Sequence, residues 1–191
     1  MQIFSSRDRT SVGSNLNSCI LNDLWEALLI KHETCWARVV SDSMSPAIRR
    51  GDQVLVEKTS SDKVRFGDII VFKRNGTLTT HRVIGKYEFG GECYFREKGD
   101  AGLQSSLVPA RDIIGRVVVV RNPSKSLTVI SGSGRLLQLN LACISYTSLQ
   151  LWRLLKYCLT LGGHTSHKHG YGAAYNGLFS WLRRNALRFF Q

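Results

Sequence analysis

Apolar and polar residues alternate in short runs between Cys35 and about Asn122. The runs rich in β-branched residues read WARVV, QVLVEK, DIIVFK, THRVIGKYEF, CYFREKGD and DIIGRVVVVR, and the turn-like sequences RRGD, RFGD, RNGT and FGGE separate them. Short runs rich in β-branched residues are typical of strands, and glycine-rich turns at this spacing are typical of hairpins. The pattern predicts a mainly β fold, a compact antiparallel domain over residues 35–122.

The segment before this domain has a different pattern. Residues 1–18 are polar and rich in Ser and Asn, which is typical of a terminal arm. Residues 20–32, ILNDLWEALLIKH, place Ile20, Leu24 and Leu28 on one side at helical spacing. We therefore expect an N-terminal arm and a short helix over residues 1–34.

Helical periodicity returns after the sequence Asn122-Pro123-Ser124-Lys125, which we interpret as a linker. The helical periodicity covers residues 135–161 and 178–190. Residues 136–152 carry no charge but several polar groups, which favours a buried or interfacial helix over a membrane span. Residues 178–190 mix apolar side chains with three arginines, an amphipathic basic pattern. Residues 123–191 are therefore expected to form a basic, partly helical C-terminal extension.

The whole chain is strongly basic, because 26 Lys and Arg outnumber 14 Asp and Glu and give a formal net charge of +12. Such a field favours acidic partners, such as nucleic acid, an anionic membrane surface or an acidic peptide. The basic segment 178–190 could lie on an anionic membrane; covering the β domain or contacting a protein partner explains it equally well. No nucleic-acid recognition motif accompanies the charge, so nucleic acid is the least favoured partner.

Cysteines and clustered histidines indicate neither a disulfide framework nor a metal site. The five cysteines are widely spaced and include no C-x-x-C: Cys19, Cys35, Cys93, Cys143 and Cys158. This usage suits a reducing compartment, and the N-terminus has no apolar core of signal-peptide length. His164, His167 and His169 lack a nearby carboxylate or thiol that would complete a ligand set. We expect a cytoplasmic or peripherally membrane-associated protein without a metal.

One turn carries residues suited to nucleophilic chemistry, in the sequence SDSMSP at 41–46. A serine hydroxyl is a poor nucleophile until a base takes its proton and donors stabilise the developing oxyanion. Ser43 lies in this turn, and His81 is the only histidine of the predicted β domain. Histidine has an ordinary pKa of about 6.5, which suits a general base at neutral pH. From composition alone, a structural or surface histidine and a serine that merely forms a turn are the more common interpretations, and Lys73 is a rival base.

Four segments, in order, resemble the type I signal peptidase family. They are S-x-S-M-x-P-x-x-x-x-G-D at 41–52, G-D-I-I-V-F-K at 67–73, H-R-V-I-G at 81–85 and K-G-D-A at 98–101. The resemblance covers about residues 38–121. It is to the archaeal and endoplasmic-reticulum branch, which has histidine where bacterial members have a lysine base.

The resemblance implies a role for each matching residue. Ser43 corresponds to the nucleophile and His81 to the base, with Asp100 placed near the histidine, where it could orient the imidazole. The Ser41 hydroxyl and the Ser43 backbone N–H correspond to the donors of the oxyanion hole.

Two other positions are accessory in this comparison. Lys73 corresponds to a lysine that is not catalytic in the family, and Arg82 follows the base in both branches.

The chain departs from the family pattern in two places. The branch usually carries a further aspartate beyond K-G-D, whereas this chain has Leu103-Gln104-Ser105-Ser106, and the family's strong membrane anchor is not evident. We expect a serine endopeptidase that resembles signal peptidase I, cleaves a leader or signal-type peptide or precursor protein after small residues, and needs no cofactor. The alternatives are a self-cleaving regulator of the SOS-repressor type, which would use lysine as its base, and a catalytically inactive peptide-binding module of the same fold.

Overall fold

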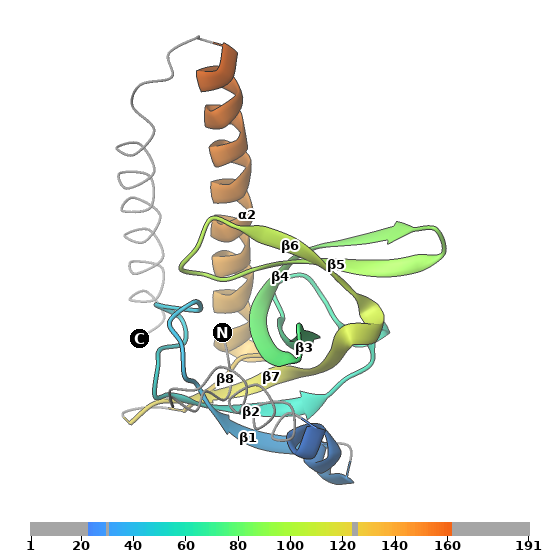
Figure 1. Cartoon of the computed structure of the whole chain (residues 1–191). Helices are drawn as coiled ribbons and strands as arrows, with labels where there is room; N and C mark the ends of the chain where they lie inside the picture. The colour runs from blue at the N-terminus through green and yellow to red at the C-terminus, as the bar shows by residue number, and fades with distance from the viewer. Residues whose placement is uncertain (1–22, 30, 124–125, 162–191) are drawn as a thin grey trace, which may run out of the picture.

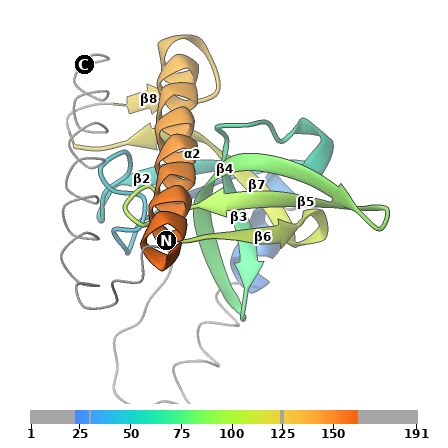
Figure 2. The ribbon, with the colours of Figure 1, turned by 90° about the horizontal axis from the view of Figure 1, so that it is seen from above.

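An eight-stranded antiparallel sheet dominates the computed structural model, which describes residues 23–29, 31–123 and 126–161. The strand order is β1-β2-β7-β3-β4-β5-β6, and β8 pairs with β7. The sheet is strongly curled, and one long helix lies along its side (Figures 1 and 2). The elements are β1 (Thr34–Arg38), β2 (Gln53–Lys58), η1 (Ser61–Lys63), β3 (Ile69–Arg74), β4 (Thr77–Phe89), β5 (Glu92–Lys98), β6 (Ser105–Pro109), η2 (Ala110–Asp112), β7 (Ile113–Arg121), β8 (Ser126–Thr128) and α2 (Gly132–Leu161).

The predicted mainly antiparallel β fold is confirmed, and a strand overlaps each of the runs that the sequence indicated. The RNGT sequence forms the tight turn between β3 and β4. Its central residues Asn75 and Gly76 have positive φ angles of 49° and 72°, the backbone conformation that a two-residue hairpin turn requires. Strands β6 and β8 were not predicted.

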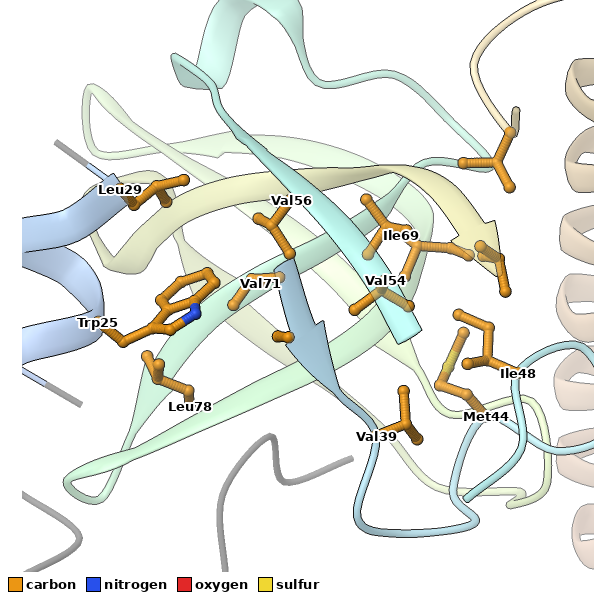
Figure 3. Close-up of a cluster of buried hydrophobic side chains, with 14 residues drawn as sticks. Trp25, Leu29, Val39, Met44, Ile48, Val54, Val56, Ile69, Val71 and Leu78 are labelled. Carbon is orange, nitrogen blue, oxygen red and sulfur yellow. The ribbon is translucent and has the colours of Figure 1, made fainter. Parts of the chain in front are cut away.

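Two hydrophobic clusters lie on opposite sides of the β3–β4 hairpin, because successive strand residues point to opposite faces. On β3, Ile69 and Val71 enter the first cluster, whereas Ile70 and Phe72 enter the second. Figure 3 shows the first cluster, which β1, β2, β7, the N-terminal helix and the turn after β1 complete. Each buried aliphatic side chain contributes about 1.5–3 kcal/mol, so this curled hairpin is a stable base for residues placed on β4.

The N-terminal helix is present over residues 23–29, and the residues it buries differ from those whose spacing indicated the helix. Trp25 and Leu29 are buried in the first cluster (Figure 3), whereas Leu24 is 56% and Leu28 is 40% exposed. Trp25 and Leu29 have the same four-residue spacing as Leu24 and Leu28, and burying the indole removes more apolar surface from water. Ile20 lies outside the described residues.

Helix α2 packs one face against the sheet and lies within the predicted C-terminal extension, after β8. Leu137, Leu141, Ala142 and Leu149 are buried, together with the polar side chains of Gln138, Ser145 and Ser148. The opposite face carries exposed apolar side chains: Leu136, Leu151, Leu154 and Tyr157. Neither helix in the described ranges is long and apolar enough to cross a membrane. The predicted basic helix at 178–190 lies outside the residues that the structure describes.

Candidate active site

The turn that carries Ser43 is anchored in the first hydrophobic cluster. Met44 and Ile48 are fully buried, and both point from this turn into the cluster (Figure 3). Backbone bonds shape the turn: the N–H of Ile48 donates to the Met44 carbonyl at 3.0 Å. The Asp52 carboxylate accepts the Arg49 N–H at 2.8 Å. Because Met44 is held in the core, the half-buried Ser43 beside it has a fixed position at the edge of the domain.

The hydroxyl of Ser43 lies against the imidazole of His81. Ser43 Oγ is 3.1 Å from His81 Nε2, within hydrogen-bond distance. His81 lies on β4, paired with Ile70 of β3, and its side chain is only 16% exposed. The two side chains that the sequence paired are therefore in contact. In this geometry Nε2 can accept the hydroxyl proton, as a general base must.

A buried glutamate occupies the other side of the imidazole. His81 Nδ1 is hydrogen-bonded to Glu97 Oε2, and Glu97 lies on β5 with its side chain 3% exposed. The second oxygen, Oε1, accepts a bond of 2.7 Å from Arg74 Nη2 and another from the Ser106 hydroxyl. Burial alone raises the pKa of Glu97, but the bond and charge of His81, with Ser106 and Arg74, outweigh it and lower that pKa to about 2. The carboxylate is therefore ionised at neutral pH.

The resemblance implies that Asp100 lies near His81 and could orient its imidazole; the structure corrects this expectation, because the carboxylate at Nδ1 is that of Glu97. The Asp100 carboxylate is fully buried and receives two bonds from Arg82, at 2.9 Å from Nε and 2.7 Å from Nη2. His81 and Arg82 are neighbours on β4, so their side chains leave opposite faces of the strand. Arg82 consequently meets Asp100 on one face, and His81 meets Glu97 on the other.

The sequence of β5 does indicate that Glu97 is buried, because side chains along a strand point alternately to its two faces. Phe95 is buried in the second cluster, and Glu97, two residues later, must share its face. A carboxylate at an inward position of a strand requires a buried partner. The resemblance to K-G-D drew attention to Asp100 instead.

The predicted accessory residue Arg82 is a buried structural link. Besides Asp100, its guanidinium donates to the Gly67 carbonyl at 3.1 Å and to the side chain of Gln138 on α2. Asp100 also accepts a bond from Ser145 of α2 at 3.4 Å. The K-G-D segment is thus held between β4 and α2.

This segment lies directly against the Ser43–His81 pair. The Ala101 N–H donates to the Ser43 carbonyl at 2.9 Å. A Cβ atom at Gly99 would lie 2.7 Å from the same carbonyl oxygen and 3.1 Å from His81 Nε2. The close approach leaves no room for a side chain at position 99.

Lys73 and Ser41 complete the set of predicted site residues. Lys73 is 43% exposed and forms ion pairs with Glu26 and, at 3.9 Å, with Asp23 of the N-terminal helix. Its side chain leaves β3 on the face opposite to Phe72 and Arg74, so the structure does not bring it to the imidazole as a rival base. Ser41 is half-buried two residues before Ser43, and its role in an oxyanion hole stays a prediction.

Within the described ranges, no group of three or more His, Cys, Asp or Glu side chains could hold a metal ion. The histidine-rich sequence at 164–169 lies outside them.

Comparison with known proteins gives two kinds of match. A family described as Peptidase S24-like matches residues 15–118, more than half of the chain. The signal peptidase complex catalytic subunit SEC11C of dog is 37% identical over 82 residues, which is 40% of this chain and 43% of that protein. The human and mouse SEC11C subunits match to the same extent. The chain thus matches less than half of the length of these curated relatives.

Proposed function

Because the chain belongs to the Peptidase S24-like family, we propose that it is a serine endopeptidase with Ser43 as nucleophile and His81 as general base. The observation that carries this proposal is the 3.1 Å separation between Ser43 Oγ and His81 Nε2. A nucleophile and base within hydrogen-bond reach, with a third group that orients the base, form the general signature of serine catalysis.

The proposed reaction proceeds in two halves. Ser43 Oγ attacks the carbonyl carbon of a peptide bond while His81 Nε2 takes its proton. The tetrahedral intermediate then collapses as His81 gives that proton to the leaving amine. Water, activated by the same imidazole, hydrolyses the acyl-serine and restores the hydroxyl. The Ser43 N–H and the Ser41 hydroxyl are the proposed donors to the oxyanion.

We propose a leader or signal-type peptide as the substrate. This class is supported by the SEC11C relatives, which are named as catalytic subunits of a signal peptidase complex. Separately, the formal net charge of +12 favours the approach of precursors that carry acidic residues.

Cleavage of a leader-peptide library by the purified full chain tests the proposal. Ser43→Ala and His81→Ala should each lower turnover by at least about a thousandfold, because each removes one half of the proton-transfer pair. Ser45→Ala, from the same turn, and His32→Ala, an exposed histidine outside the sheet, are matched controls that should retain full turnover. Equal turnover in wild type, Ser43→Ala and His81→Ala would refute the proposal. Peptide binding without cleavage by the wild type would instead indicate an inactive binding module.

A further inference from the structure

We propose that Glu97 is the positioning residue of this site: it holds His81 through Nδ1 and is itself clamped by Arg74 and Ser106. The inference deepens the proposed function and rests on the Ser43–His81 chemistry. It assigns the carboxylate of the site to β5 rather than to the K-G-D segment. Three features of the site support this role for Glu97: the tautomer of the imidazole, the restraint of the carboxylate, and the burial of the pair.

The first feature is the tautomer of His81. A neutral imidazole carries one proton, and the group that accepts it decides which nitrogen keeps it. An ionised carboxylate is only an acceptor, so Glu97 Oε2 requires the proton to be on Nδ1. Nε2 then presents its lone pair to the Ser43 hydroxyl, 3.1 Å away. Glu97 therefore selects the tautomer in which His81 can act as a base.

The second feature is the restraint on Glu97 itself. Oε2 is occupied by His81, while Oε1 receives bonds from the Arg74 guanidinium and the Ser106 hydroxyl. Arg74 also contacts Ser106 and stacks 5.0 Å from the centre of the Phe72 ring. Arg74, His81 and Ser106 lie on β3, β4 and β6, three other strands of the sheet, so the carboxylate on β5 is fixed from several directions.

The position of Ser106 in the sequence bears on the missing second aspartate. It lies in the segment where the family resemblance led us to expect a second aspartate, and it contributes a hydroxyl that donates to Glu97. The negative charge beside His81 thus lies on β5, and the serine of β6 donates a hydrogen bond to it.

The third feature is burial. Side chains of His81 and Glu97 are 16% and 3% exposed, and the Phe72 ring lies 6.2 Å from the imidazole, centre to centre. Interactions between charges are stronger where water is excluded. The pKa of Glu97 is lowered to about 2, so its charge is present when His81 becomes an imidazolium in the reaction. Glu97 therefore stabilises that cation as well as orienting its neutral precursor.

Nitrogen NMR of the full chain, labelled with ¹⁵N-histidine, tests the inference without needing a substrate. The His81 signals are identified as those lost in His81→Ala. At a pH where the ring is neutral, the wild type should show a protonated Nδ1 and an unprotonated Nε2. In Glu97→Gln the amide can donate a hydrogen bond to Nδ1. The tautomer protonated at Nε2 should therefore replace, or coexist with, the tautomer protonated at Nδ1.

Turnover of a cleaved leader peptide gives the second measurement. Glu97→Gln should lower kcat by about 10²–10⁴-fold with little change in KM, because the base has the wrong tautomer and no counter-charge. Arg74→Ala keeps Glu97 but removes one of its restraints, and should lower kcat by roughly tenfold. Glu97→Asp, which retains the charge, should recover at least about tenfold over Glu97→Gln.

Glu92→Gln and Arg111→Ala are matched controls, because these two residues form an exposed ion pair with each other, with 2.8 Å between Glu92 Oε1 and Arg111 Nη1. Both should leave the His81 spectrum and kcat unchanged. Folding of each variant is checked by its thermal midpoint. An unaltered His81 tautomer together with an unaltered kcat in folded Glu97→Gln would overturn the inference while leaving the Ser43–His81 proposal standing. Full activity in Ser43→Ala would overturn the proposed function, and the tautomer measurement would still decide whether Glu97 holds the imidazole.

Discussion

Replacing Gly99 with alanine should damage the site through a single added methyl group. The Cβ atom would lie 2.7 Å from the Ser43 carbonyl oxygen and 3.1 Å from His81 Nε2, whereas ordinary van der Waals contact begins at 3.4 Å. The first contact is with backbone, which cannot rotate away as a flexible side chain would. The carbonyl and Gly99 must therefore separate by about 0.7 Å, on the scale at which misplaced catalytic groups lose activity.

The same carbonyl accepts the Ala101 N–H at 2.9 Å, so the separation also strains the bond that joins the turn to the K-G-D segment. We expect kcat to fall by about 10- to 100-fold, because Ser43 and His81 are displaced relative to each other. Overpacking should also cost about 1–3 kcal/mol of unfolding free energy. In a chain of this length, each kcal/mol lowers the thermal midpoint by about 2–4 °C.

Gly102→Ala is the matched control for this substitution. The nearest atom to a Cβ at Gly102 is the Gln104 nitrogen at 3.9 Å, so the added methyl has room. Neither Gly99 nor Gly102 has a left-handed φ angle, so the two variants differ in steric crowding and not in backbone strain. Steady-state cleavage of one leader peptide and thermal unfolding are measured for both variants. Equal kcat values for Gly99→Ala and Gly102→Ala would refute the reasoning.

Three further predictions concern stability. Arg82→Met should lower the unfolding free energy, measured in urea, by about 3–5 kcal/mol, because it leaves the buried Asp100 carboxylate without its guanidinium partner. Adding Asp100→Leu should recover most of this loss, and an additive loss in the double variant would contradict the prediction. The pKa of Glu97 falls from 4.5 to about 2 on folding, so its stabilisation is complete above pH 4.5 and lost as pH falls toward 2. This stabilisation amounts to about 3 kcal/mol of unfolding free energy. The loss of stability between pH 4.5 and 2 should therefore be smaller by this amount in Glu97→Gln than in the wild type. Trp25→Ala should cost about 3–5 kcal/mol and Leu24→Ala within about 0.5 kcal/mol, and equal losses would indicate that the helix buries a different face.

Much of the fold could be predicted because its strands are short runs rich in β-branched residues, bounded by turns. The pattern located β1–β5 and β7, and the turn sequence RNGT located the tightest hairpin. Strands β6 and β8 escaped prediction for a physical reason. β6 (Ser105–Pro109) is a short strand at the end of the sheet order and begins with two serines, and β8 has only three residues. Their pairing depends on neighbouring strands more than on their own apolar content.

The candidate site could be predicted only in part. Ser43 and His81 could be paired from motif order, and the structure brings them together. The carboxylate was misassigned because proximity along K-G-D does not reveal which face of the sheet a side chain takes. That depends on strand register: Glu97 is paired with Val83 on β4, which shares the face of His81. The contribution of Ser106 depends on β6, a strand that the sequence did not reveal.

The proposed mechanism requires that Ser43 become acylated with the help of His81. An activated ester of a leader-type peptide, mixed with the full chain and quenched in acid, allows the covalent intermediate to be weighed and mapped by mass spectrometry. We expect an acyl group on Ser43 in the wild type, none in Ser43→Ala and a greatly slowed accumulation in His81→Ala. Acylation of another residue at the same rate in all three proteins, or ester cleavage by all three with no bound acyl group, would contradict it.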